Sequence, residues 1–458
     1  MTQLRLYIHS AILGIPAMVL ILTVGLFLTV RLGFPQLRLF PRALGLFLRR
    51  LFAGKRTADE GVSPFQALCT ALAATVGTGN LVGVAGAICL GGPGAIFWMW
   101  VCALLGMATK YAEAALAVRF RVKTPEGYAG GPMYTITRGL GEPFRPLAKA
   151  YCLFGILAAF GVGNAAQINA VVTGVNGVVS RAGGQPGMAG NAVMGLMLAL
   201  LTGALLFGGA KRIGKAAEML VPFAAGMYIL LCIGVLVVFR SRIPAALGQI
   251  VSGAFCPRAA TGGMLGSAFQ ALSVGCSRGV FTNEAGMGTA SIAHACAEAP
   301  AAEQGLMGII EVFLDTIVIC TLTALVILTS GVPIPYGTDT GAELTTQAFS
   351  VVYGSPAGVL LAAALILFAI ATILGWGLYG VRCAQFLSGS WKPFAAAQTA
   401  MVVLGAVLDT ETVWQLSELA NGLMAIPNLI SLAALTPELR RITKEFIKTG
   451  ASGSRRRR

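Results

Sequence analysis

The amino-acid sequence predicts an all-α protein that crosses a membrane about eleven times. The composition is 56% hydrophobic and only 11% charged, whereas soluble domains carry roughly 25% charged residues. Apolar runs of about 20 residues, the length that spans a bilayer as a helix, recur along the chain. Two of these runs are interrupted by clusters of glycine and polar residues, which a plain membrane helix does not need.

The predicted spans follow from the apolar runs. Lipid offers no hydrogen bonds to the backbone, so spanning segments must be helices or closed barrels, and runs of this length indicate helices. The runs cover residues 8–31, 66–91, 93–118, 149–180, 190–209, 217–239, 262–290, 307–330, 357–381, 394–409 and 412–435. No small-residue cleavage site follows the first run, so we expect no cleavable signal peptide.

The net charge of +15 follows the loops rather than any nucleic-acid motif. Most of the 33 lysines and arginines lie after the first, third, fifth and ninth spans and in the C-terminal tail. Because cytoplasmic loops are enriched in these residues, the pattern predicts a bacterial inner-membrane protein with its N-terminus outside and its C-terminus in the cytoplasm. We expect no nucleic-acid partner, and contact of the terminal arginines 455–458 with anionic membrane lipid.

The two interrupted runs are residues 70–80 and 273–288. Glycine at mid-depth lets a helix unwind, and unwound backbone is tolerated in a membrane only where it is buried in protein or lines a wet cavity. The N-termini of half-helices then offer amides to an anion, while their C-termini offer carbonyls to a cation. Glycine patterns also occur on helix-packing faces, so each segment alone is open to both interpretations.

The positions of the interrupted runs predict an internal repeat. Without the first span, five spans lie in residues 66–239 and five in 262–435, and each half opens with an interrupted helix. Because five is odd, the halves enter the membrane from opposite sides, as in inverted-repeat transporters. The predicted domains are therefore an N-terminal helix with a basic loop (1–65), these two repeats, and a basic tail (436–458).

Other functional classes find little support in the sequence. The ten cysteines and two histidines show no metal-ligand spacing, and most cysteines lie inside apolar runs, so we interpret them as small hydrophobic residues. A membrane enzyme would need a clustered catalytic set, and the sequence offers none. The alternative to a symporter that stays open is an ion carrier or channel-like protein without an organic substrate.

Many sequence blocks, in order, carry a resemblance to a known family. They are 76–80 (VGTGN), 91–100 (GGPGAIFWMW), 106–113 (GMATKYAE), 130–134 (GGPMY), 279–288 (GVFTNEAGMG), 315–316, 320–321, 368–376 (FAIATILGW) and 422–428 (GLMAIPN). From about residue 10 to 435 the chain resembles the alanine-or-glycine:cation symporter family. This implies a leucine-transporter-like fold, sodium-driven uptake of small neutral amino acids such as alanine or glycine, and no cofactor beyond the coupling sodium ion. The chain departs from the family pattern at Ala371, where a second hydroxyl is expected beside Thr372, and Thr282 replaces an expected serine.

The resemblance and the first interrupted run together suggest the binding residues. We expect the substrate carboxylate to meet backbone amides of the first break, which comprises Thr75, Gly77, Thr78, Gly79 and Asn80. We expect sodium to bind Thr372 together with Gly77 and Ala74. The alternatives are helix packing for the glycines and a bond to its own helix carbonyl for the threonine.

Three further residues are expected around the substrate. Gln167 would accept from the substrate ammonium, or would form an ordinary interhelical hydrogen bond. Trp376, one turn after the sodium-binding threonine, would limit side-chain size, or would belong to an interfacial aromatic belt. Phe281 would act like the tryptophan from the second break.

Charges inside spans are costly and are usually functional or paired. Arg278 and Glu284 flank the second break, and we expect them to pair or to gate the pathway. Asp315 would line the pathway or belong to a structural network. Lys110 and Glu113 are three residues apart on one helix face, which favours a local ion pair. The sequence does not choose among alanine, glycine and serine as substrates.

Overall fold

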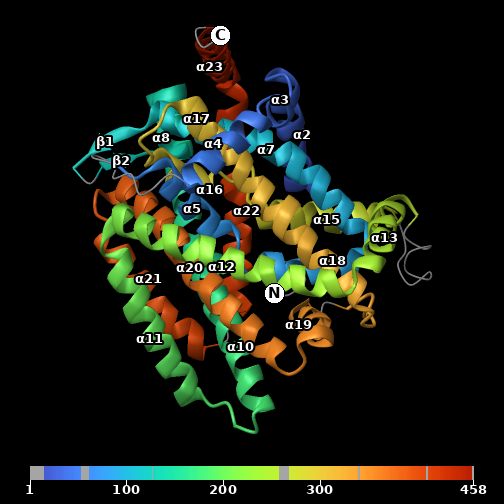
Figure 1. The fold of residues 1–458 in the computed structure, drawn as a ribbon. Helices are drawn as coiled ribbons and strands as arrows, with labels where there is room; N and C mark the ends of the chain where they lie inside the picture. The colour runs from blue at the N-terminus through green and yellow to red at the C-terminus, as the bar shows by residue number, and fades with distance from the viewer. Residues whose placement is uncertain are drawn as a thin grey trace.

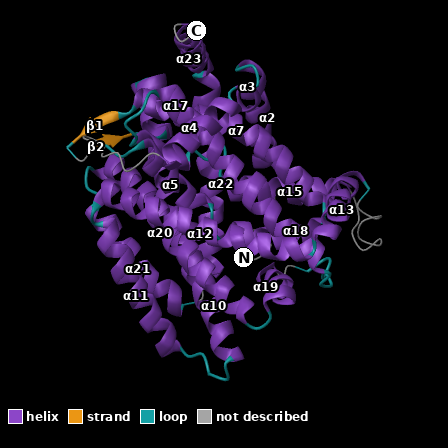
Figure 2. Cartoon of the chain, in the orientation of Figure 1, coloured by secondary structure: helices purple, strands orange, loops and turns teal. Residues whose placement is uncertain are grey.

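The computed structural model describes residues 15–52, 61–125, 127–256, 268–338, 341–408 and 411–455. Within these ranges almost all regular structure is helical (Figure 1), and the two-stranded antiparallel hairpin of β1 (Val122–Thr124) and β2 (Gly127–Ala129) is the only sheet (Figure 2). The predicted all-α fold class is confirmed. The predicted residues 8–14 and 262–267 lie outside the described residues.

The N-terminal region supplies three helices before the first interrupted run. They are α2 (Ile15–Arg31), α3 (Pro35–Arg38) and α4 (Phe40–Phe52). Helix α2 packs against α7 (Gly94–Phe120), and α4 packs against α17 (Ala301–Val312). These helices therefore cover the outside of a core that later segments build.

Residues 64–255 contain the first group of core helices. Their elements are α5 (Pro64–Thr75), η2 (Gly79–Gly83), α6 (Val84–Gly91), α7, α8 (Pro132–Thr135), η3 (Ile136–Leu140), η4 (Glu142–Phe144), α9 (Arg145–Phe160), η5 (Gly161–Ala165), α10 (Ala166–Arg181), α11 (Met188–Leu206), α12 (Gly209–Val238), η6 (Arg240–Arg242) and α13 (Ile243–Phe255). Segments η2, η3 and η5 are π-helical, and such wide turns in membrane helices often mark functional sites.

Residues 268–455 contain the second group. Its elements are α15 (Ala268–Asn283), α16 (Thr289–Ala295), α17, the π-helical η7 (Phe313–Cys320), α18 (Thr321–Ser330), α19 (Gly341–Tyr353), α20 (Pro356–Ser388), α21 (Lys392–Val407), α22 (Glu411–Ala434) and α23 (Thr436–Arg455). The long helix α20 packs against α5, α9, α10 and α12. It thereby brings the second half of the chain against the first interrupted run.

The predicted spans fall on helices or broken helices. Six continuous helical segments among the described residues are long and apolar enough to cross a membrane, and two of them, Glu142–Ser180 and Ala301–Ser330, join several of the elements named above. Counting each of two bent pairs as one span raises the number among the described residues to eight. One of these pairs is Pro64–Thr75 with Gly79–Gly91, bent by 52°. Pro16–Arg31 and Lys392–Val407 are shorter apolar helices. The count of eleven and the division into two repeats stay predictions.

Several elements were not among the predicted spans. They are α4, α13, α19, α23 and the hairpin β1–β2. None offers an apolar run of membrane-spanning length, which is the signal on which the prediction depended. Helix α23 begins directly after α22 with a bend of 62°, and its buried apolar side chains Leu439 and Ile442 face the protein.

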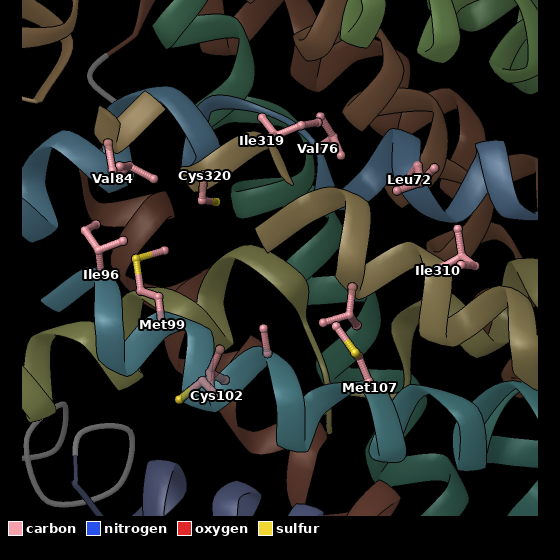
Figure 3. Packing of buried hydrophobic residues seen from close by; sticks show 14 of the residues in the cluster. Leu72, Val76, Val84, Ile96, Met99, Cys102, Met107, Ile310, Ile319 and Cys320 are labelled. Atoms are coloured by element: carbon pink, nitrogen blue, oxygen red, sulfur yellow. The ribbon is translucent and has the colours of Figure 1, made fainter. Parts of the chain in front are cut away.

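A hydrophobic core fixes the first interrupted run against α7 and η7. Figure 3 shows this cluster, in which Leu72 and Val76 of the first run lie among Met99, Met107 and Ile319. Small residues allow the close approach of α7 and α17: a Cβ at Gly308 would lie 2.7 Å from the backbone oxygen of Lys110. A small residue on one helix lets the backbone of its neighbour approach closely, as is common in membrane proteins.

Candidate functional site

The first break separates α5 from α6. Helix α5 ends at Thr75 because Val76 adopts an extended conformation (φ −78°, ψ 105°). The backbone amide of Gly77 then donates to Oδ1 of Asn80 at 2.8 Å instead of to a helix carbonyl. The chain resumes as η2 at Gly79. The predicted break is therefore present, and Asn80 satisfies one of the amides that the unwinding releases.

The second break separates α15 from α16. Glu284 has a left-handed backbone (φ 52°), which is rare for a non-glycine residue, and Gly286 (φ 98°) and Gly288 (φ 77°) also have positive φ. Helix α15 therefore ends at Asn283, and α16 starts at Thr289. This break falls inside the interrupted run that the sequence indicated, at its C-terminal end.

The two breaks meet at a small cavity of about 30 Å³. Its lining comes from α5 and the first break, η5, α10, the last turn of α15, the second break and α20. The lining residues are Ala74, Thr75, Gly77, Thr78, Gly79, Val162, Gln167, Phe281, Thr282, Glu284, Thr372 and Trp376. The fold thus brings the residues predicted for substrate and sodium to one place, apart from Asn80. A space of this volume has room for about two water molecules.

Thr372 lies on α20 beside the first break. Its hydroxyl oxygen is buried and has no hydrogen-bond partner among the described residues. A Cβ built on Gly77 would lie 3.0 Å from this oxygen. A buried hydroxyl normally finds a partner, and a membrane threonine usually bonds to the carbonyl four residues earlier. The hydroxyl oxygen of Thr372 is therefore available to contact a ligand in the small cavity.

Gln167 lies on α10 with its side-chain amide fixed by two contacts. Its Nε2 donates to the carbonyl of Val162 at 3.1 Å, and its Oε1 accepts from the hydroxyl of Thr78 at 3.4 Å. The carboxamide oxygen is therefore directed toward the first break. Trp376 is fully buried, and its ring stands edge-on to that of Tyr379 with centroids 5.7 Å apart. It forms one wall of the small cavity.

A larger cavity of about 520 Å³ adjoins the small one. Thr78, Gly79 and Phe281 line both, so these residues stand between the two spaces. Arg278 and Glu343 line only the larger cavity, whereas Glu284 lines only the smaller. The carboxylate of Glu284 accepts from the hydroxyl of Thr289 at 2.6 Å. The two charges that flank the second break thus face different spaces.

Asp315 and Asn80 lie behind the cavity rather than in it. The Nδ2 of Asn80 donates to Oδ1 of Asp315 at 2.8 Å and to its backbone oxygen at 3.2 Å. Oδ2 of Asp315 accepts from the hydroxyl of Thr316 at 2.8 Å, and Asn283 donates to that hydroxyl at 3.4 Å. A hydrogen-bonded chain through η7 therefore connects the first break with the end of α15.

The expected local ion pair between Lys110 and Glu113 is wrong. Lys110 pairs instead with Glu311 of α17 at 2.9 Å. The other oxygen of Glu311 contacts Nε2 of His294 at 2.9 Å. The chain packs α7 so closely on α17 that the lysine reaches across the interface, which satisfies a buried charge better than a neighbour on the same helix.

Glu113 instead holds the second break. Its Oε1 accepts from the backbone amides of Gly286 at 2.9 Å and Gly288 at 3.0 Å, and from Nδ2 of Asn428 at 2.7 Å. Sequence reasoning missed this role, together with the cavity residues Val162 and Thr282. The sequence features that could have indicated Val162 and Thr282 are the glycines within residues 161–164 (GVGN) and the hydroxyl at position 282.

Broken helices that meet at a polar cavity, inside a bundle of membrane-spanning helices, define a secondary transporter. A model of the sodium:alanine symporter family matches residues 1–458. The chain belongs to this family. It is a multi-pass, sodium-coupled amino-acid symporter and not an enzyme.

Individual comparisons support the same class. The chain is 43% identical over 448 residues to the sodium/alanine symporter AgcS of Methanococcus maripaludis, covering 96% of both chains. It is 37% identical over 442 residues to the probable sodium/glutamine symporter GlnT of Bacillus subtilis, covering 95% of this chain and 88% of the relative. The crystal structure of MhsT in complex with L-phenylalanine shares the fold, with a TM-score of 0.58, 15% identity, and coverage of 83% of this chain and 90% of that one.

Proposed function

We propose that this protein imports small neutral amino acids, alanine or glycine, together with sodium by alternating access. The observation that carries the proposal is the unsatisfied hydroxyl of Thr372 beside the first break, at a cavity that the two broken helices share. Sodium and substrate then bind next to each other. Bound sodium orders the site, so the substrate then binds at a lower cost in conformational entropy. This shared site couples the sodium gradient to substrate uptake.

The proposed sodium ligands are the hydroxyl of Thr372 and backbone oxygens of Ala74 and Gly77. Sodium binds oxygen, and the C-terminal end of a half-helix carries partial negative charge on carbonyls without intrahelical partners. Ala74 belongs to the last turn of α5, and both it and Gly77 line the small cavity. The chain has Ala371 where a second hydroxyl was expected, so Thr372 would be the one side-chain hydroxyl among the proposed sodium ligands.

The proposed carboxylate site is the start of the second half-helix of the first break. The Gly77 amide is already bonded to Asn80, which leaves the amides of Thr78 and Gly79 for the substrate. The N-terminal end of a helix attracts an anion. Asn80 therefore supports this site from behind rather than contacting the substrate.

The proposed ammonium acceptor is Oε1 of Gln167, because its Nε2 is held by a backbone carbonyl. Trp376 and Phe281 would limit the side chain of the substrate. The two aromatic rings at the small cavity favour a hydrogen or methyl side chain over an amide chain such as that of glutamine. This is why alanine or glycine is proposed, although one relative carries a sodium/glutamine name.

The proposed orientation has the N-terminus outside and the C-terminus in the cytoplasm, as the loop charges indicate. The larger cavity runs along α10 from Ala166 to Val178 and borders α19, so in this orientation it leads to the outside. Phe281 and Thr78 separate it from the substrate cavity. Substrate would enter from the larger space past these residues.

Substitutions at the sodium site test the proposal. Thr372→Ala is expected to raise the sodium concentration for half-maximal uptake at least about tenfold, since one charge-assisted contact is worth roughly 1.5–3 kcal/mol. Thr372→Ser keeps the hydroxyl and is the matched control. Gly77→Leu is expected to abolish uptake because its Cβ alone would lie 3.0 Å from Thr372 Oγ1. Unchanged sodium dependence in Thr372→Ala, with transport intact in Gly77→Leu, would sink the proposal.

A further inference from the structure

The start of α5 and the end of α16 are joined by a short backbone bridge on the side away from the larger cavity. Val62 and Ala297 form a parallel β-bridge. The amide of Val62 donates to the carbonyl of Cys296 at 3.1 Å, and the amide of Glu298 donates to the carbonyl of Val62 at 3.0 Å. The amide of Gly61 donates to the side-chain carboxylate of Glu298. Main-chain hydrogen bonds thus hold the start of α5 to the segment that follows α16.

The fit at this bridge is close, and the residues around it are apolar. A Cβ at Gly61 would lie 2.5 Å from the carbonyl oxygen of Cys296, so only glycine permits the approach. Val62, Cys296 and Ala297 form a small buried apolar cluster with Ala67 of α5. A path between α5 and α16 is therefore shut at this end, whereas the larger cavity adjoins the binding site from the other.

Arg121, which follows α7, caps the bridge. Its guanidinium donates to the carbonyl of Ala295, the last residue of α16, at 3.5 Å, and to the carbonyl of Ala297 just beyond the helix. The same guanidinium lies over the ring of Tyr128, 3.9 Å from the ring centroid. Tyr128 belongs to the hairpin β1–β2, so Arg121 links the hairpin to the end of the second broken helix.

The residues after the hairpin tighten this link. A Cβ at Gly130 would lie 2.5 Å from the Cβ of Ala295, and one at Gly131 (φ 118°) would lie 2.6 Å from Cγ1 of Ile292. The chain after β2 thus packs closely against α16 over about one turn. Arg121 and the hairpin cannot stay in place if the end of α16 moves.

We propose that the bridge of residues 61–62 with 296–298 closes the transport path on this side, and that Arg121 is the positioning residue that holds it closed. The inference rests on the proposed alternating-access function. Each cycle must open this side once, and the bridge is the contact that separates the two broken helices from the solvent there. Opening breaks the main-chain bonds at Val62 and withdraws the carbonyls of Ala295 and Ala297 from Arg121.

A reversible cross-link tests the bridge. The double variant Val62→Cys/Ala297→Cys, as the full chain in proteoliposomes, is expected to lose at least about tenfold of its sodium-driven alanine uptake on oxidation and to regain it with reductant. The single variants are the controls for pairing with native cysteines. Sodium-dependent alanine binding to the oxidised protein in detergent is expected to persist. Uptake that survives complete cross-linking would overturn the proposal, as would failure of the two cysteines to pair. Absent uptake in the reduced protein and both single variants would instead count against the proposed function.

The role of Arg121 is tested through a native reporter. Cys296 is buried in the bridge and free, so its alkylation by a small thiol reagent measures opening. Arg121→Gln is expected to speed this reaction at least about tenfold, and Arg121→Lys less, because charge-assisted bonds to two carbonyls are lost. Cys232, buried in another helix, is the matched control. An unchanged rate at Cys296, or an equal acceleration at Cys232 that signals general unfolding, would overturn the proposal.

Discussion

Asn80 binds the backbone amide of Gly77 with one end of its side chain and the carboxylate of Asp315 with the other, at 2.8 Å each. The amide of Gly77 can only donate, so the orientation of the Asn80 side chain is fixed. Asp315 in turn accepts from Thr316, whose hydroxyl accepts from Asn283 at the end of α15. The conformations of the two breaks are therefore tied together by side chains that lie outside the cavity.

Loss of the carboxylate at position 315 should weaken transport without touching the substrate. Asp315→Ala leaves the Asn80 amide with fewer acceptors in a buried place, which costs about 1–3 kcal/mol. We expect sodium-driven uptake to fall at least about fivefold at equal amounts of reconstituted protein. Asp315→Asn retains one oxygen acceptor and is expected to lose less. Wild-type uptake by Asp315→Ala would contradict the role assigned to this chain of hydrogen bonds.

Glycine at position 163 is expected to be required for the position of Trp376 in the cavity wall. A Cβ there would lie 2.3 Å from the Cβ of Trp376, which cannot move without its backbone. Gly163→Ala should therefore displace the tryptophan at a cost of about 1–3 kcal/mol and abolish most uptake. Gly226→Ala on α12, where a Cβ meets nothing within 4 Å, is the control and should transport normally. Equal uptake by both variants would show that the wall tolerates movement.

Trp376 is expected to set the size limit for the substrate. Trp376→Leu enlarges the cavity, so uptake of a larger neutral amino acid such as leucine should rise relative to uptake of alanine. We expect a rise of about tenfold, because room for one further methylene changes the preference of an apolar pocket by at least about that factor. Competition of unlabelled leucine against labelled alanine measures this ratio. Trp391→Leu, at the residue just before α21, provides the comparison because Trp391 does not line the cavity. A ratio that does not change in Trp376→Leu would place the size limit elsewhere.

The free energy of unfolding is expected to depend on Lys110 and Glu311 as a buried ion pair, so that removing one charge destabilises the protein more than removing both. Glu311→Gln leaves a buried lysine without its carboxylate, and such losses cost about 3–5 kcal/mol. The double variant Lys110→Met/Glu311→Gln removes the unpaired charge and should recover part of the stability. Thermal unfolding in detergent compares the three proteins. A double variant less stable than the single one would mean that the lysine has another carboxylate partner.

Local features of the fold were predictable from the sequence, and long-range ones were not. The breaks at Val76 and Glu284 lie where glycines and polar residues interrupt apolar runs, because unwinding depends on local backbone freedom. The partner of Asn80 is 235 residues away along the chain. Nothing in the spacing of either residue indicates that contact.

The error at Lys110 has the same origin. A spacing of three residues correctly places Glu113 on the same helix face, but the packing of α7 against α17 and the second break offers each residue a better partner. Glu311 and the amides of Gly286 and Gly288 lie far along the sequence. Side chains of the small cavity were easier to predict, because the family resemblance concerns those blocks of sequence directly.

The coupling of sodium to small amino-acid uptake can be measured as the accumulation of labelled alanine in proteoliposomes. With an inward sodium gradient the protein should accumulate alanine above its outside concentration, and without the gradient it should only equilibrate. Unlabelled glycine should compete with alanine. Accumulation that is independent of sodium, or no accumulation of alanine or glycine under any sodium gradient, would contradict sodium-coupled uptake of these amino acids by this protein.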